Sequence, residues 1–388
     1  MCSAQPPAES FPEVDLTATD TGSVPLSATH QAYGASEGGF RYAHSTPSPS
    51  FEPRHMDRVA VEAYLATTLA SGATLPSGAG RRARPEEPDP YRDCFRRDLD
   101  RIKHSPAFRR LAHKTQVFIA PENDHLRTRL THAIEVAQFA TAVSRALGLN
   151  ETLTEAIALA HDVGHGPAGH ASEDAFSPFM PSGVYDHAVY GANVTLAPLN
   201  LCAETLDGVR NHSWKLPSPS TPEGDVVSWA DRVAYVCHDF DDATRAGIVT
   251  ASDLPSEVRT VVGVSQSRQL NRFFIHMVEA SRAAGRVCMD EEGAAALDAF
   301  RRFNYERIYL RPASRKQEEK VVTLLRGLVE LYASKPWLLG DVSPEPAPGS
   351  PESVAQAVRH VSGMTDRYAF REAVDLLGWD PADLPRGV

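Results

Sequence analysis

The sequence has few cysteines and no long apolar run, and both features limit the class of protein to which it can belong. Five cysteines are scattered along the 388 residues, an odd number with no Cys-x-x-Cys pair. This spacing argues against a disulfide framework and against a thiolate zinc site. No stretch approaches the roughly 20 apolar residues that cross a bilayer, and the first residues lack the basic start and apolar core of a secretion signal. We expect a cytoplasmic protein with no membrane partner.

Basic residues are also fewer than acidic residues. The chain has 39 Lys and Arg against 50 Asp and Glu, a formal net charge of −11. A generally basic surface for nucleic acid is therefore excluded, although a local basic groove for single-stranded nucleic acid stays open. With 42% hydrophobic residues, the composition is that of a globular protein with a large core.

Strand-like alternation of apolar and polar residues is nearly absent, and apolar residues recur instead at spacings of three and four. This period is typical of amphipathic helices. Gly148 is expected to end one helix and Asn150 to precede the next. The sequence therefore predicts an all-α fold, with helices at Thr131–Leu147, from Glu151 onward, and at Asp225–Ala246, Leu270–Ala284, Ala294–Ile308 and Gln317–Tyr332.

Stretches rich in Pro, Gly and Ser divide the chain into parts. Such stretches lack the periodicity of a packed core. The predicted parts are a disordered leader at 1–53, a helix plus linker at 54–88, the main helical domain at 89–342, a linker at 343–352 and a helical tail at 353–388 that packs on the main domain.

Histidines gather in one part of the sequence. Clustered histidines with carboxylates are how a chain builds a metal or acid–base site. For any single histidine, the alternative is an ordinary core or surface residue satisfied by backbone carbonyls. Six of the 15 histidines lie between positions 125 and 187: His125, His132, His161, His165, His170 and His187.

The segment AHDVGHGPAGHASE at 160–173 contains three of these histidines. His161 and His165 are four residues apart, so they share one helix face if the helix persists. The Gly/Pro run at 164–169 breaks the helix and lets His170 fold back toward the same cavity. This pattern predicts three imidazoles and Asp162 around one point.

Two more residues flank this segment at a distance in the sequence. His132 lies in RTRLTHAIE, one turn after Arg129, and Asp231 lies in the apolar helix SWADRVAYV. An unpaired carboxylate in an apolar helix is costly, so Asp231 requires either a metal ion or an ion pair. Imidazoles and carboxylates without thiolates suit Mn²⁺, Fe²⁺, Zn²⁺ or Mg²⁺ and leave positions open for water.

In this order, the four residues His132, His161, Asp162 and Asp231 resemble the signature of HD-domain metal-dependent phosphohydrolases. Within that superfamily, several segments look like the deoxynucleoside triphosphate triphosphohydrolases, the dGTPase-like family. The segments are RRLAHKTQVF (109–118), DHLRTRLTHAIEVA (124–137), LTEAIALAHDVGHGPAGHASE (153–173), ADRVAYVCHDFDDATRAG (230–247) and VSGMTDRYA (361–369).

The resemblance implies an HD-domain helical fold and a divalent metal ion, which is Mn, Fe, Zn, Co or Mg. His132, His161, Asp162 and Asp231 match the family's metal ligands. A further Mg²⁺ on the triphosphate is also compatible with the family.

The resemblance also implies roles for residues around the α-phosphate. His170 and its acidic partner Glu173 match the pair assigned to the catalytic step, and His165 and His187 match further histidines near the phosphate. A carboxylate three residues away can orient an imidazole for general acid–base work. Weaker matches, at positions that contact sugar or phosphate in relatives, are Gln116, Arg129, Tyr235 and Asp239.

Some positions depart from the family or carry an alternative reading. Ala168 stands where relatives have the Phe of PPFGH, and Ala188 stands where Asn is expected. Stacking and edge hydrogen bonds distinguish bases, so the inherited base preference does not transfer. Asp239 has the alternative of a charge on a solvated helix face.

Together these features predict hydrolysis of a deoxynucleoside triphosphate to deoxynucleoside and inorganic triphosphate. A homo-oligomer, for instance a hexamer, is expected by analogy with relatives. Two alternatives stay open: hydrolysis of another nucleotide phosphoester such as a nucleoside monophosphate, and a nucleotide-binding regulatory protein that kept the fold without turnover.

Overall fold

A computed structural model gives the structure of the chain and divides it into two compact units, Met1–His55 and Met56–Val388. In the first unit, strands β1 (Ser36–Glu37) and β2 (Phe40–Arg41) pair antiparallel. The predicted disordered leader lies mostly outside the described residues. The residues that the structure describes are 36–37, 40–41, 49–119, 123, 125–340 and 346–385.

The second unit is helical. Its described residues contain no β-strand, so the predicted all-α fold is confirmed. The α-helices are α2 (Arg58–Thr68), α3 (Cys94–His104), α4 (Pro106–Arg110), α5 (Arg129–Leu147), α6 (Glu151–Ala160), α7 (His170–Phe176), α8 (His187–Tyr190), α9 (Ala203–Arg210), α10 (Pro222–Arg245), α11 (Ser256–Val261), α12 (Gln266–Ala284), α13 (Glu291–Asn304), α14 (Pro312–Ser334), α15 (Pro351–Ser362) and α16 (Asp366–Leu377).

Short helical turns connect these elements. Two of them have π geometry, η3 (Gly191–Thr195) and η6 (Tyr305–Tyr309). The others are 3₁₀ turns: η1 (Leu111–His113), η2 (Ser177–Phe179), η4 (Ala197–Leu199), η5 (Ala251–Asp253), η7 (Pro336–Leu339) and η8 (Pro381–Asp383).

Local caps set the ends of α5 and α6, the two helices that lead into the histidine segment. Thr128 caps α5, and Gly148 ends it with a positive φ of 71° that favours glycine. The Asn150 side chain then accepts a hydrogen bond from the Leu153 amide at 3.1 Å and starts α6. The predicted stop and start at these residues are confirmed.

Caps also explain where two observed helices differ from the expected ranges. Helix α10 begins at Pro222 rather than Asp225, because the Thr221 hydroxyl accepts a hydrogen bond from the Gly224 amide at 3.1 Å. Helix α13 begins at Glu291 rather than Ala294, after the Asp290 cap, and gives way to the π turn η6 before Ile308.

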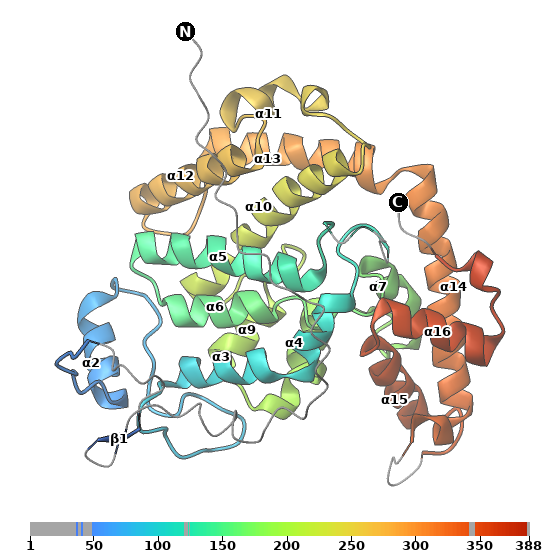
Figure 1. Ribbon diagram of the computed structural model, residues 1–388, viewed down its shortest axis with the longest axis horizontal. Helices are drawn as coiled ribbons and strands as arrows, with labels where there is room; N and C mark the ends of the chain where they lie inside the picture. Colours follow the sequence, from blue (N-terminus) through green and yellow to red (C-terminus); the bar gives the residue numbers. More distant parts are fainter. Residues whose placement is uncertain are drawn as a thin grey trace, which may run out of the picture. The chain divides into compact units, whose positions relative to one another are not determined.

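The larger core lies among the helices that carry the HD segment. Helix α6 packs between α5 and α3, and α10 packs across α5, α6 and α9 (Figure 1). Fully buried side chains such as Phe95, Leu99, Leu153 and Ile157 fill this core. The rigid packing of α5, α6 and α10 fixes the backbone from which the metal-site residues project.

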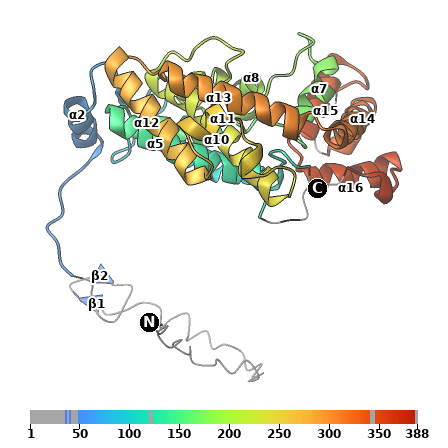
Figure 2. The ribbon, with the colours of Figure 1, turned by 90° about the horizontal axis from the view of Figure 1, so that it is seen from above.

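A second core forms around α14. Helices α7, α15 and α16 all contact α14, and Figure 2 shows α7, α14 and α15 gathered at one end of the helical unit. Its apolar side chains include Leu324, Leu328 and Phe370. The predicted tail from 353 onward is thus two helices, broken at 363–365, and α15 already begins at Pro351 inside the expected linker.

The segment at 71–88, expected as linker, is hydrogen-bonded to the helical unit. Glu223 accepts hydrogen bonds from the Thr74 amide at 3.0 Å and the Thr74 hydroxyl at 2.6 Å. Arg82 forms a buried ion pair with Asp98 at 2.5 Å. Buried charged groups are stable only when paired, so these contacts hold the segment in place.

Among the described residues, no helix combines the length and the apolar character that crossing a membrane requires.

Candidate metal centre

Helix α6 ends at Ala160 and delivers His161 into the protein interior. The His161 ring is 1% exposed, and its Nδ1 donates to the Ala158 carbonyl oxygen at 2.6 Å. A neutral imidazole has one N–H, so this bond leaves a lone pair on Nε2. Nε2 is buried and has no hydrogen-bond partner. A buried nitrogen with a lone pair and no hydrogen-bond partner is available to bind a metal ion.

Two carboxylates face this nitrogen. Asp231 Oδ1, from α10, lies 3.6 Å from His161 Nε2 and 3.0 Å from His132 Nε2 on α5. Asp162 Oδ1 also lies 3.6 Å from His161 Nε2. The four residues expected as ligands therefore meet at one place, although they come from α5, the turn after α6, and α10, up to 99 positions apart.

The donor set fits a divalent metal. One atom each of His132, His161 and Asp162 can be chosen within 4.8 Å of one another, and the same holds for His161, His212 and Asp231. Nitrogen and carboxylate donors without thiolate suit Mn, Fe, Zn, Co or Mg and leave positions open for water. The ligand assignment itself stays a prediction.

The electrostatics of the site favour a cation. Burial would lower the pKa of His161, but the Asp162 and Asp231 carboxylates outweigh it and raise this pKa to about 9. Burial would raise the pKa of Asp162, but His161, Arg129 and His165 hold it well below its usual value. The pKa of His161 is raised by two carboxylates in a dry site, whereas the pKa of Asp162 is lowered by the basic groups around it.

Arg129 is buried beside the centre. Its Nη1 donates to Asp162 Oδ2 at 2.7 Å, and its Nε has no hydrogen-bond partner. The guanidinium also lies close to Gly169, where an added Cβ would meet Nη2 at 2.4 Å. Arg129 therefore fixes one oxygen of Asp162 and leaves Oδ1 facing the histidines.

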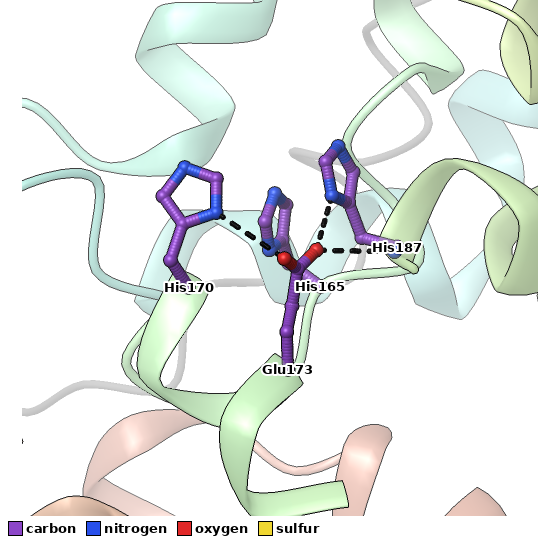
Figure 3. Close-up of side chains that lie close together, drawn as sticks. All are labelled: His165, His170, Glu173 and His187. Carbon is purple, nitrogen blue, oxygen red and sulfur yellow. Dashed lines mark hydrogen bonds and ion pairs between the residues drawn. The ribbon is translucent and has the colours of Figure 1, made fainter. Parts of the chain in front are cut away.

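Four side chains form a second group next to the metal ligands, which we call the histidine loop: His165, His170, Glu173 and His187 (Figure 3). The rings of His165 and His187 stack with centroids 3.7 Å apart. Glu173 Oε1 accepts a hydrogen bond from His187 Nδ1 and from the His187 amide, whereas Oε2 lies 3.7 Å from His170 Nδ1.

These contacts set the charge of Glu173. Burial would raise its pKa, but the neighbouring imidazoles of His170 and His187 more than offset this and hold the pKa far below its ordinary value. Glu173 is thus a carboxylate that touches two imidazoles. The His170 side chain is 74% exposed and faces solvent, unlike its buried neighbours.

The helix expected to carry both His161 and His165 does not persist. Helix α6 ends at Ala160, so the four-residue spacing does not act through a shared helix face. A tight turn instead brings His165 Nε2 to 3.3 Å from Asp162 Oδ1. Gly164 permits this turn, because an added Cβ would meet the His187 carbonyl oxygen at 2.0 Å and the Gly191 amide at 2.6 Å.

Contacts from two other parts of the chain hold the backbone of the turn at 164–169. Asp366, the first residue of α16, accepts a hydrogen bond from the Ala168 amide at 2.8 Å, and Ala168 has a positive φ of 58° that is uncommon for a non-glycine residue. The buried Lys114 ammonium donates to the carbonyl oxygens of His165 and, at 2.9 Å, Ser362. Burial, together with Arg110, lowers the pKa of Lys114 to about 7.

Sequence reasoning missed His212, which the structure brings into the site. His212 follows α9, is 2% exposed, and its Nε2 lies 3.2 Å from His187 Nε2. A lone histidine after a helix carries no spacing signal, so nothing in the sequence singles it out. The Ser228 hydroxyl, on α10, donates to the His212 carbonyl at 2.6 Å, and the Ser228 backbone carbonyl accepts from the Trp214 indole at 3.2 Å.

Comparisons with known proteins identify the domains that carry these residues. The HD domain matches residues 129–236, and the phosphohydrolase-associated domain matches residues 287–375. A deoxyguanosinetriphosphate triphosphohydrolase-like protein of Caldanaerobacter subterraneus subsp. tengcongensis is 40% identical over 302 residues, covering 74% of this chain and 86% of the relative. The chain belongs to this dGTPase-like family of HD-domain proteins. It is a hydrolase of that family, and HD domains bind divalent metals.

Two further members of the family carry the same name. A deoxyguanosinetriphosphate triphosphohydrolase-like protein of Clostridium perfringens is 38% identical over 310 residues, covering 75% of this chain and 89% of the relative. Another, of Cereibacter sphaeroides, is 35% identical over 380 residues, covering 80% of this chain and all of the relative.

In this dGTPase-like chain, the other expected substrate contacts lie in the segment after η1, which carries Gln116, and on α10, which carries Tyr235 and Asp239. Gln116 Oε1 is buried without a hydrogen-bond partner, and the Tyr235 hydroxyl accepts from Arg301 Nε at 3.0 Å. Asp239 is 3% exposed and accepts from the Tyr309 hydroxyl, so the alternative of a solvated surface charge is wrong. Burial raises the pKa of Asp239 to about 8.

Proposed function

We propose that this protein hydrolyses a deoxynucleoside triphosphate to deoxynucleoside and inorganic triphosphate, using a divalent metal ion. One observation carries the proposal: the orphaned Nε2 of His161 faces two carboxylates, with the histidine loop directly alongside. The names of the relatives point to the same substrate class.

His132, His161, Asp162 and Asp231 would hold the metal. When bound, a divalent metal supplies Lewis-acid polarisation of a phosphoryl oxygen and lowers the pKa of water. Arg129 keeps Asp162 in one orientation through its 2.7 Å ion pair and adds positive charge beside the site. A second Mg²⁺ on the triphosphate is compatible with this arrangement.

The histidine loop supplies the proton chemistry in this proposal. Glu173 holds the proton of His187 on Nδ1, so His187 Nε2 acts as an acceptor toward the centre. His170, solvent-accessible and 3.7 Å from Glu173 Oε2, is the group that protonates the departing 5′-oxygen. His165, stacked on His187, orients the phosphate, and Gln116, Tyr235 and Asp239 contact the nucleotide.

A substrate panel tests the proposal. The four dNTPs, the four NTPs and the matching nucleoside monophosphates are incubated with the full chain and Mn²⁺, Mg²⁺ or Co²⁺, and products are separated by chromatography. We expect deoxynucleoside and inorganic triphosphate, in a 1:1 ratio. Orthophosphate release, or turnover of a nucleoside monophosphate instead, would move the activity to another nucleotide phosphoester. Binding without any turnover would make the protein a nucleotide-binding regulator.

A further inference from the structure

Two cysteines that are far apart in the sequence meet where two helices begin. Cys94 is the first residue of α3 and is 1% exposed, and Cys202 directly precedes α9 and is 0% exposed. A Cβ added at Gly80 would lie 3.2 Å from Cys94 Sγ and 2.4 Å from Cys202 Sγ. Both sulfur atoms therefore lie next to one point, and both cysteines are free thiols in this structure.

The surroundings of Cys94 favour its thiolate. A hydrogen bond with the Cys202 thiol lowers the pKa of Cys94 and outweighs the effect of burial. Its place at the start of α3 acts in the same direction, because the N-terminus of a helix carries partial positive charge. The Arg82 guanidinium donates to the Cys94 carbonyl oxygen at 2.9 Å and pairs with Asp98, which accepts from the Cys202 amide at 2.8 Å. One of the two thiols is thus prepared to act as a nucleophile.

The backbone at Gly80 packs directly against the two thiols. Gly80 has a positive φ of 78°, and any side chain there would collide with the cysteines, so the position requires glycine. Its neighbours Ser77, Gly78 and Ala79 are exposed or half-buried. The thiols therefore lie beneath a segment that faces solvent, and a local opening of that segment gives a molecule as small as hydrogen peroxide access to them.

We propose that Cys94 and Cys202 form a redox modification site, which hydrogen peroxide converts into a reversible disulfide. The Cys94 thiolate attacks one oxygen of the peroxide, the O–O bond breaks, and the departing hydroxide takes up the proton that Cys94 released to form water. The Cys202 thiol then attacks the sulfur of the Cys94 sulfenic acid, and its proton leaves with the hydroxyl group as a second water. The two thiols lose two electrons, which the peroxide gains.

The disulfide would join the helices that lie against α6. Helix α6 contacts both α3 and α9, and it leads directly into His161. A crosslink that closes a long loop of the chain stabilises the fold, because it removes conformational freedom from the unfolded state. We therefore expect oxidation to raise the Tm by about 5 °C. The reaction needs neither metal nor nucleotide, so the inference is independent of the proposed function.

Peptide mapping tests the site in the wild-type chain. The reduced full chain is treated with a small excess of hydrogen peroxide, denatured, alkylated with iodoacetamide and digested with trypsin without reductant. We expect mass spectrometry to find the peptides of Cys94 and Cys202 joined, about 2 Da lighter than the two thiol peptides together, and separated again by dithiothreitol. Cys237, whose thiol pKa is raised by burial, should be recovered alkylated. Separate Cys94 and Cys202 peptides, whether alkylated or carrying sulfinic acid, overturn the proposal.

Thermal unfolding with matched variants tests the crosslink itself. Oxidised and reduced samples are followed by circular dichroism, and the gain in Tm should be absent from Cys202→Ala. Cys237 is also 0% exposed, so Cys237→Ala removes a buried thiol of the same size and should keep the gain. An equal gain in Cys202→Ala overturns the assignment. If a variant fails to fold, the peptide map of the wild-type chain still decides.

Discussion

Glu173 lies between two imidazoles and contacts one of them more closely than the other. It accepts hydrogen bonds from the ring and the amide of His187, whereas the His170 ring lies 3.7 Å from its other oxygen. The sequence predicted only the His170 partnership, because three residues along a helix is a local spacing. The His187 contact spans 14 positions and depends on how α7 and α8 meet.

Removing the Glu173 carboxylate should therefore release both rings. We expect Glu173→Ala to lower the single-turnover rate by about 10²–10⁴, the range of general acid–base help, and to be at least as slow as His170→Ala. The double variant should be about as slow as Glu173→Ala alone, since groups that act as one unit are not additive. Rates that fall multiplicatively, with metal content unchanged, would assign Glu173 a separate role.

Variants of the proposed metal ligands test whether metal binding can be lost while the fold is kept. We expect His161→Ala or Asp162→Ala to lose bound metal and activity while keeping helix content, because the apolar core around α5, α6 and α10 does not need the ion. Elemental analysis and circular dichroism measure both quantities. His238→Ala, in the other His-Asp pair of the chain, should retain metal; equal metal loss in both variants would refute the ligand assignment.

At the scale of single residues, the sequence predicts those positions that a motif or a local spacing defines. His161-Asp162 is such a case. His212 is not such a case. Its place in the site depends on a hydrogen bond to the Val209 carbonyl and on a contact with His187, which lies 25 positions earlier in the chain. Arg129 was predicted as a phosphate contact, and its ion pair with Asp162 follows only from the packing of α5 against the turn after α6.

At the scale of elements, helix existence follows from apolar periodicity, whereas helix ends follow from caps. Gly148 and Asn150 are strong signals and their positions were predicted correctly. The end of α6 at Ala160 was not, because the break depends on Gly164 packing against the backbone of His187 and Gly191. Close backbone contact between distant segments leaves no periodic trace in a sequence.

Helix α16 contributes to the site through its first residue. Asp366 is fully buried and accepts from the Thr115 amide at 2.9 Å, from the Thr115 hydroxyl, and from the Ala168 amide at 2.8 Å. Asp366→Ala removes the carboxylate that accepts from both amides, so we expect it to lower the free energy of unfolding by about 2–5 kcal/mol. Urea denaturation measures this loss.

A residue on the same helix provides the control. Asp375 is exposed on α16, and Asp375→Ala should change the free energy of unfolding by less than about 0.5 kcal/mol. Hydrogen exchange at residues 164–169 should accelerate in Asp366→Ala only. Equal protection from exchange in both variants would show that Asp366 does not hold the turn at 164–169.

At the scale of the whole molecule, every residue assigned to the site lies in the unit Met56–Val388. The aligned relatives likewise match 74–80% of this chain. We expect deletion of residues 1–53 to preserve nucleotide hydrolysis within a few-fold, because a Pro- and Ser-rich segment without periodicity buries little apolar area. Steady-state rates of the folded, truncated chain check this; complete loss of activity would mean that the leader completes the site or the oligomer.

Assembly and location stay predictions at this scale. A homo-oligomer, for instance a hexamer, is expected from the family resemblance, and analytical ultracentrifugation of the full chain measures it. Single-stranded nucleic acid as a partner, and residence in the cytoplasm, likewise rest on sequence reasoning alone.

The hydrogen bonds around His212 have an optical consequence. The Trp214 indole, two residues from His212, shares Ser228 with the His212 carbonyl and lies under the Arg232 guanidinium at 3.6 Å. Its ring also contacts Trp229, with centroids 4.7 Å apart. Any change in the position of His212 therefore alters the surroundings of an indole pair, and intrinsic fluorescence reports such changes at the buried site.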